Sequence, residues 1–461
     1  VTDAADRAVI EKVWDVPAGT ISPTPGLDAV AMFQKIEAGE VKAVWIIGTN
    51  PVASMPNRSR VIAALQRAEL VVVQDAFHPT ETTRYADILL PGALWAEAEG
   101  TMVNSERNVT FMPRAVAPPG EARADWQIIA QVAQQMGFAK HFNYACAGDV
   151  FDEIRRTWNP KTGYDLRGMD YTKLAEQPRQ WPMPPGAERG EPIRYLSQAV
   201  NGSFPLTPAL SLGEREKRSQ LHGKAATESC SQALNPNRNE QLLSPLPAGE
   251  GQGEGERGVI RFPASSGKAQ FFARPFLPPA EQPDAEFSFV LTNGRVAHQW
   301  HTLTKTGKVA ALNKLNPGAF LELHPLDAEQ LGVHQGVLVK VASRRGFAIY
   351  PAQVTTRVRP GECFAPIHWN EMFGENLAVN TTTTEAVDAI SLQPEFKFSA
   401  VALSKVSMGV PDHFTEEQKN HLLRCLAQVS PRGQVVPPEA PFTPAQREFI
   451  SRLLARMEAE I

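Results

Sequence analysis

The sequence predicts an α/β fold in which a partial, doubly wound parallel-sheet domain is followed by a small β-barrel. Short β-branched runs at residues 41–47 and 69–73 predict the sheet, because each is bounded by turn residues and a helix-like segment separates them. Beyond Gly258 short strand-like runs replace long helices, which is typical of a closed barrel. We therefore expect two structural regions with different architectures.

The first region follows the order strand, helix, strand. Residues 57–68 carry apolar side chains at helical spacing on one face, and a third apolar run at 86–90 follows the second strand. This order is typical of a parallel sheet whose connections are right-handed crossovers. A further helix is expected at 126–136, ended by Gly137.

Polar residues follow the predicted strands where these end. Asn50 lies in the GTNP turn after the first strand, Gln74 and Asp75 end the second, and the polar cluster at 80–82 comes next. Open α/β sheets bind ligands beyond the carboxyl ends of their strands. Asp75 is therefore suited to accept hydrogen bonds from a guanine edge or a ribose, while a simple loop cap is the alternative for a lone Asp.

The second region contains short strands and one short helix. The helix is expected at 325–331, closed by Gly332. The strands are expected at 288–291, 337–342, 348–354 and 363–368.

Three strings of the sequence resemble one protein family. The string QDAFHPTETTRYADILLPGALWAEAEGTMVNSER is similar to the molybdopterin-dependent oxidoreductases, the dimethyl sulfoxide reductase family, and most of all to the assimilatory nitrate reductases within it. TNGRVAHQWHT, then PIHWNEMFGENLAVN with QPEFKF, resemble the C-terminal β-barrel of the same family. The similarity covers residues 1–200 and 259–405. It implies a six-stranded barrel of the double-psi type and, as cofactor, molybdenum bis(molybdopterin guanine dinucleotide).

The resemblance also implies a set of cofactor-binding residues, without a catalytic residue or a metal ligand. In the first region they are Asn50, Gln74, Asp75 and Asp125. In the barrel they are Asn293, Gly294, Arg295, Val296, Trp300, His301, Thr302, Asn380 and Lys397. Ala98 departs from the pattern, because periplasmic nitrate reductases have a cofactor-contacting lysine at this position.

The loop chemistry agrees with this assignment. Residues 293–295 offer a turn with close backbone approach and a guanidinium, which suits a pyrophosphate. Trp300, His301 and Thr302 add a flat face and hydrogen-bonding groups suited to a pterin. A purely structural histidine is the alternative for His301, and the tripeptide NGR is by itself a common turn.

The composition of the chain restricts the kinds of partner and metal site that it is expected to have. The chain has 46 Lys and Arg against 50 Asp and Glu, a net charge of -4, which argues against a nucleic-acid surface. No apolar run approaches the roughly 20 residues of a membrane span, so we expect no membrane partner and a cytoplasmic location. The four cysteines lack the CxxC spacing of a cluster or zinc site. The family's [4Fe-4S] cluster and molybdenum ligand are therefore expected upstream, in a region that this chain lacks.

The expected domain organisation has five parts. Residues 1–165 form the α/β domain, 166–202 an extended Pro-rich connection, 203–258 a disordered insertion, 259–405 the barrel, and 406–461 a helical tail. The insertion contains PLTPALSLGEREK and LLSPLPAGEGQGEGER, which resemble the translated halves of an inverted repetitive DNA element. An ordinary disordered loop is the alternative, and neither interpretation places site residues there.

The tail carries two capping-box patterns, TEEQ at 415–418 and TPAQ at 443–446, which predict two terminal helices. The segment APFTPAQREFISRLLARMEAE resembles the opening of the flavoprotein subunit of sulfite reductase. This similarity implies a missing fused reductase with FAD or FMN. Two helices that pack on the barrel are the alternative.

Together these patterns predict the C-terminal part of an enzyme that reduces nitrate to nitrite by oxygen-atom transfer, with a flavoprotein or ferredoxin-type electron donor. A formate dehydrogenase of the same family is the first alternative. A non-catalytic cofactor-binding module and an electron-transfer adaptor organised around the tail helices are the others.

Overall fold

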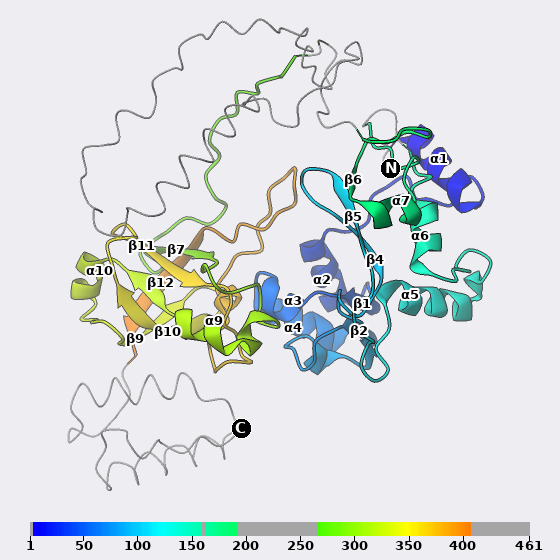
Figure 1. Cartoon of the computed structure of the whole chain (residues 1–461). Coiled ribbons are helices and arrows are strands. Elements are labelled where there is room, and N and C mark those ends of the chain that lie inside the picture. The colour runs from blue at the N-terminus through cyan, green and yellow to red at the C-terminus, as the bar shows by residue number, and fades with distance from the viewer. Residues whose placement is uncertain (1–2, 159–162, 191–265, 267, 407–461) are drawn as a thin grey trace, which may run out of the picture. The chain divides into compact units, whose positions relative to one another are not determined.

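The computed structural model describes residues 3–158, 163–190, 266 and 268–406. The chain divides into two compact units, whose helices and strands are labelled in Figure 1. The described part of the first unit comprises residues 3–99, 113–145 and 276–406. The second unit comprises residues 100–112 and the described residues between 146 and 275.

The first unit contains the predicted parallel sheet. Strands β1 (Ala43–Ile47), β2 (Leu70–Asp75) and β3 (Ile88–Pro91) are adjacent in that order, and both pairings are parallel. Helices α2 (Ala29–Glu37) and α4 (Arg58–Arg67) contribute to its core. The core residues are Phe33, Ile36, Val44, Ile46, Val52, Val61, Ala64, Leu65, Val71 and Val73. The sheet predictions are confirmed.

The helix predicted at 126–136 is confirmed with one difference. Helix α5 (Asp125–Ala133) continues as a π-helical turn, η2 (Gln134–Phe138), in which Gly137 has φ 94°. Glycine adopts this left-handed backbone without steric cost, so it stands where the helix loses its regular geometry. The other helical elements of this part are α1 (Ala4–Trp14), α3 (Pro51–Ser54) and η1 (Thr83–Tyr85).

A closed six-stranded barrel forms the rest of the first unit, in the order β10-β8-β11-β7-β12-β9. Its strands are β7 (Phe289–Gly294), β8 (Leu321–Leu323), β9 (Leu338–Ala342), β10 (Phe347–Val354), β11 (Glu362–Pro366) and β12 (Ser399–Lys405). Its helical elements are η3 (Thr306–Lys308), α9 (Ala310–Leu315), α10 (Pro325–Gln330) and η4 (Val379–Thr381). The predicted barrel is confirmed, and so are the four strands and the one helix that the sequence predicted for it. Gly332 follows α10 with φ 62°, as expected for the glycine that ends this helix.

Apolar side chains fill the barrel. Leu291, Leu321, Leu323 and Tyr350 are at most 1% exposed. The Tyr350 hydroxyl donates to the carbonyl oxygen of Leu377 at 2.9 Å, and burial raises the pKa of this phenol well above its usual range. Because side chains occupy the interior, ligand chemistry is to be sought at the ends of the strands.

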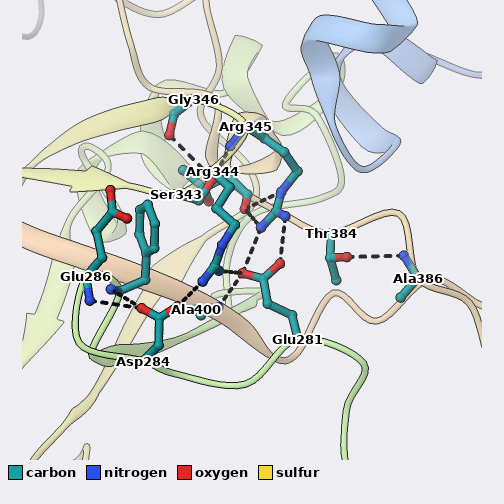
Figure 2. Close-up of polar contacts among 12 residues, drawn as sticks. Glu281, Asp284, Glu286, Ser343, Arg344, Arg345, Gly346, Thr384, Ala386 and Ala400 are labelled. Atoms are coloured by element: carbon teal, nitrogen blue, oxygen red, sulfur yellow. Dashed lines mark hydrogen bonds and ion pairs between the residues drawn. The ribbon is translucent and has the colours of Figure 1, made fainter.

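The segment that leads into β7 is attached to the barrel by ion pairs. Figure 2 shows Arg344 and Arg345, from the turn between β9 and β10, pointing toward Glu281. The Glu281 carboxylate also accepts a hydrogen bond from the backbone N–H of Ala400 in β12, at 3.1 Å. One carboxylate thus connects the lead-in segment to two parts of the barrel.

The second unit has its own small core. Strands β4 (Gly100–Val103), β5 (Asn108–Met112) and β6 (Arg179–Gln180) form an antiparallel sheet. Helices α6 (Ala147–Ile154) and α7 (Tyr171–Glu176) belong to the same unit. The extended conformation predicted from residue 166 is wrong for 171–176. Asp170 caps α7 by accepting from the Lys173 backbone N–H at 2.8 Å, and this local bond outweighs the Pro-rich surroundings.

Two predicted segments lie outside the described residues, namely the insertion at 203–258 and the tail helices beyond 406. Among the helices that the structure does describe, none has both the length and the apolar character needed to cross a membrane.

Candidate functional site

All predicted cofactor-binding residues lie in the first unit. Asn50 follows β1, Gln74 and Asp75 end β2, and Asp125 begins α5. The barrel residues lie at the end of β7, in the loop after it, in η4 and just before β12.

The Asn50 side chain is engaged by protein groups at both ends. Its Nδ2 donates to Oε2 of Glu81 at 2.6 Å and to Oγ1 of Thr302 at 3.3 Å. Its Oδ1 accepts from the hydroxyl of Thr82 at 2.6 Å and from the Thr82 backbone N–H at 3.2 Å. Asn50 therefore brings the polar cluster at 80–82 together with Thr302, and a ligand that contacts this amide must share it with these groups.

Glu81 presents a buried carboxyl oxygen at the same place. The residue is 2% exposed, and Oε1 has no hydrogen-bond partner within the described part of the chain. Burial raises the pKa of Glu81, and the hydrogen bond from Asn50 opposes this shift. The sequence indicated Glu81 only as a member of a polar cluster and not as a site residue.

The end of β2 brings three predicted residues together. Gln74 is fully buried and donates from Nε2 to Oδ1 of Asp125 at 2.7 Å, while its Oε1 finds no partner in the described ranges. Asp75 accepts from the backbone N–H of Phe77 at 2.9 Å, so it does cap its loop. Burial raises the pKa of Asp75, and the nearby Asp125 raises it further. A Cβ at Gly92 would lie 3.2 Å from Oδ1 of Asp125, so glycine leaves room for this carboxylate.

A second cluster of buried polar side chains lies at the end of β7. Asn293 is 1% exposed and donates from Nδ2 to Oδ1 of Asn380 at 3.1 Å, and its carbonyl oxygen accepts from Nζ of Lys397 at 2.6 Å. Asn380 in turn donates to the carbonyl oxygen of Ala53 at 2.9 Å. Burial lowers the pKa of Lys397, and Arg295 lowers it further. Oδ1 of Asn293 is without a partner among the atoms described.

Gly294 is required by close packing at this strand end. A Cβ there would lie 2.8 Å from Cε2 of Phe364 in the paired strand β11, and 3.8 Å from Nζ of Lys397. Any larger residue would force the Phe364 ring to move.

The loop after β7 displays an aromatic and cationic surface. Trp300 is 49% exposed, and its ring meets the His301 ring edge to face with centroids 4.5 Å apart. The Arg295 guanidinium carbon lies 5.5 Å from the Trp300 ring centroid, and Nη2 of Arg295 lies 3.5 Å from Nε2 of His301. Burial lowers the pKa of His301, and Arg295 and Lys305 lower it further, which favours the neutral ring.

The backbone of Val296 contacts His368, a residue that the sequence did not indicate. Its N–H donates to Nε2 of His368 at 2.9 Å, and His368 is fully buried. The only signal in the sequence was its place in the PIHWN string, where a buried histidine cannot be distinguished from an apolar core position.

Two protein families match separate regions of the chain. Residues 12–135 match the family described as molybdopterin oxidoreductase, and residues 289–400 match the molybdopterin dinucleotide-binding domain. The chain belongs to the molybdopterin oxidoreductase family. The resemblance found in the sequence is thereby confirmed.

The curated relatives of this chain have two kinds of name. A nitrate reductase of Synechocystis sp. is 36% identical over 401 residues, which cover 87% of this chain and 48% of the relative. The assimilatory nitrate reductase catalytic subunit of Bacillus subtilis is 30% identical over 399 residues, covering 86% and 46%. A formate dehydrogenase alpha subunit of Methanococcus maripaludis is 31% identical over 388 residues, covering 84% and 46%. The chain thus spans about half the length of these relatives.

A solved structure shares the fold. Acetylene hydratase from Pelobacter acetylenicus has a TM-score of 0.54 at 16% sequence identity, and the match covers 88% of this chain and 50% of that one. At this identity the likeness supports the α/β and barrel architecture alone.

The residues present fit a molybdopterin dinucleotide. Buried polar atoms in proteins are nearly always hydrogen-bonded. Within the described residues, nine buried side-chain polar atoms have no partner, and they include Oε1 of Gln74, Oε1 of Glu81 and Oδ1 of Asn293. A ligand rich in N–H donors, such as a pterin or guanine, would satisfy these three oxygens. The exposed Arg295 guanidinium offers charge for phosphate groups.

Proposed function

We propose that this chain is the dinucleotide-binding part of a molybdenum enzyme that reduces nitrate to nitrite. One observation carries the cofactor assignment: each of the two family-matched regions leaves a buried amide oxygen unpaired at the end of a strand, on Gln74 in β2 and on Asn293 in β7. The names of the relatives at 36% and 30% identity support nitrate as the substrate.

The chain's own residues would bind and orient the cofactor. Gln74 and Asp75 offer oxygen acceptors for the N–H groups of a guanine or the hydroxyls of a ribose. Arg295 supplies a fork of donors for the pyrophosphate, and Trp300 a flat apolar face for the pterin. When bound, the molybdenum centre supplies the oxygen-atom transfer, while the protein supplies orientation and electrostatics.

The longer protein is part of the proposal. We infer that the region beyond this chain in the relatives' length carries the [4Fe-4S] cluster and the molybdenum ligand. A flavoprotein or ferredoxin-type donor, with FAD or FMN in a fused reductase, would deliver the electrons. A cytoplasmic location and the absence of membrane and nucleic-acid partners belong to the same proposal.

Formate oxidation is the second candidate. A formate dehydrogenase alpha subunit matches at 31% identity over 84% of the chain, nearly as well as the assimilatory nitrate reductase. Because the two groups share the cofactor-binding regions, the chain's site serves either reaction. Substrate assays of the enzyme must distinguish them.

The first test is metal and pterin analysis of the full-length parent protein from a molybdenum-competent host, with a nitrate assay driven by reduced viologen. Stoichiometric molybdenum with nitrate turnover supports the proposal. Molybdenum with formate oxidation and no nitrate turnover supports the second candidate. Absence of both metal and pterin would refute the cofactor assignment.

Two variants test the site. Asp75→Ala and Arg295→Ala should each lower the molybdenum and pterin content several-fold, because each removes a proposed dinucleotide contact. Arg359→Ala, which removes an exposed arginine elsewhere on the barrel, is the control and should leave the content unchanged. Equal metal content in all three variants would contradict the proposed contacts.

A further inference from the structure

We propose that His368 is a positioning residue that fixes the shape of the loop at residues 295–302. The proposal deepens the proposed function, because it assumes that this loop binds the dinucleotide. His368 follows β11 and is fully buried. It belongs to neither the loop nor the set of residues that the resemblance implies.

The imidazole holds the loop at two points. Nε2 accepts a hydrogen bond from the backbone N–H of Val296 at 2.9 Å. Nδ1 lies 2.7 Å from the carbonyl oxygen of His301. A carbonyl only accepts, so Nδ1 carries the proton and Nε2 carries the lone pair. Both hydrogen bonds require one neutral tautomer of His368.

The loop needs such support because its backbone is strained near its end. His301 has φ 41° and Leu303 has φ 64°, the left-handed region in which a residue other than glycine is held only by its surroundings. Within the loop, Gln299 N–H meets the Val296 carbonyl oxygen only at the long distance of 3.5 Å. The bond from His368 to the His301 carbonyl thus acts directly on a strained residue.

The position of the side chains follows from that of the backbone. Arg295 precedes one attachment point, Val296, and the other attachment point is the carbonyl of His301 itself. Trp300 packs against the His301 ring. His368 therefore sets where the cationic and aromatic groups of the loop stand, without touching a ligand.

Burial lowers the pKa of His368 and so favours the neutral ring. The hydrogen bond with the His301 backbone opposes this shift, whereas Arg295 and the His301 ring, the titratable groups that act on it, lower the pKa further. Trp369 lies edge to face with centroids 5.9 Å apart and adds no charge.

The wild-type chain provides the first test, which does not depend on a variant folding. In protein labelled with ¹⁵N-histidine, the His368 signal should show a protonated Nδ1 and an unprotonated Nε2 at pH 7. A proton on Nε2 would overturn the proposal, because Val296 N–H would then have no acceptor.

Three variants form the second test. In His368→Gln the amide oxygen can take the place of Nε2, and in His368→Asn the amide N–H can take the place of Nδ1. His368→Ala removes both bonds. Hydrogen exchange of the Val296 amide should accelerate about tenfold in the Ala and Asn variants, and the Gln variant should restore protection. Molybdenum and pterin content of the full-length parent should fall furthest in the Ala variant.

The outcomes separate this proposal from the proposed function. Unchanged Val296 exchange in His368→Ala, or equal loss of protection in the Gln and Ala variants, overturns the positioning role. A wild-type parent that holds no molybdenum or pterin, with the expected Val296 exchange pattern, overturns the proposed function and leaves the role of His368 in the loop intact.

Discussion

Three buried residues of the site destabilise the ligand-free chain. Gln74, Glu81 and Asn293 are almost fully buried, and within the described residues each leaves one oxygen without a hydrogen bond. An unsatisfied buried group costs about 1 to 3 kcal/mol. A ligand that donates to these oxygens removes the cost, so the same residues that destabilise the free chain favour the bound state.

Glu81→Gln should stabilise the chain in a pH-dependent way. Burial raises the pKa of Glu81 above its ordinary value of 4.5, so the folded state holds the proton more tightly than the unfolded state. The stability that Glu81 contributes is fully present below pH 4.5 and is lost as the pH rises through the raised pKa. Relative to wild type, the uncharged Gln variant should therefore gain more stability at pH 8 than at pH 5.

Denaturant unfolding of both proteins at pH 5 and pH 8 measures this difference. Glu329→Gln, on an exposed position of α10, makes the same chemical change away from the site and is the matched control. If Glu81→Gln changed the free energy of unfolding equally at both pH values, the pKa of Glu81 would not be raised in the folded chain.

At the scale of elements, the packing between β7 and β11 requires a residue without a side chain at position 294. We expect Gly294→Ala to destabilise the chain by about 1 to 3 kcal/mol, because the added Cβ overlaps the Phe364 ring. Adding Phe364→Leu should recover part of this loss, since the smaller side chain leaves room. Thermal unfolding of the single and double variants measures the coupling. Additive effects would contradict the steric cause, and Gly26→Ala, whose Cβ would meet nothing within 4 Å, is the control.

The lead-in segment before β7 offers a comparison of two ion pairs. The Glu281 and Arg345 side chains are 12% and 16% exposed, whereas those of Asp284 and Arg344 are 47% and 40% exposed. Removing one partner of a mostly buried pair leaves the other charge unpaired, so Glu281→Gln should cost roughly 2 kcal/mol. Asp284→Asn, which removes an exposed pair, should cost clearly less than Glu281→Gln.

Chemical unfolding by urea at low and high salt separates the two cases. Salt screens exposed charges, so the Asp284→Asn effect should vanish at high salt while most of the Glu281→Gln effect remains. Equal costs for the two variants would mean that burial does not strengthen the Glu281 pair.

Local patterns explain which parts of the fold were predictable. The runs that became β1, β2 and β10 are short, apolar and bounded by turn residues, and these are local properties. Strand β8 has three residues and is too short for any period, and α7 depended on one capping bond. The contact of Asn50 with Thr302 joins residues 252 positions apart, which no local pattern encodes.

Resemblance predicted more of the site than local patterns did, but it could not predict how the residues are used. It indicated Asn50 as a cofactor contact, and the structure shows its amide already engaged by Glu81, Thr82 and Thr302. It gave no role to His368, whose two hydrogen bonds depend on the final path of the loop. Hydrogen-bond partners follow from tertiary structure, and a sequence motif fixes only their chemistry.

At the scale of the whole molecule, the two family-matched regions are separated by a long stretch that neither match includes, residues 136–288. Every candidate cofactor-binding residue lies within or beside the matched regions. The sequence of residues 203–258 is rich in Gly, Pro and polar residues without periodicity, and it predicts no core element and no site residue.

Deleting residues 203–258 should therefore leave cofactor binding intact. We expect the full-length parent with this deletion to keep its molybdenum and pterin content, because none of the proposed contacts is removed. The melting temperature should stay within a few degrees, since the cost of closing a chain segment changes only with the logarithm of its length. Metal analysis and thermal unfolding of the deletion beside wild type measure both quantities. Loss of cofactor with an unchanged melting temperature would place a ligand contact inside the deleted segment, contrary to the sequence prediction.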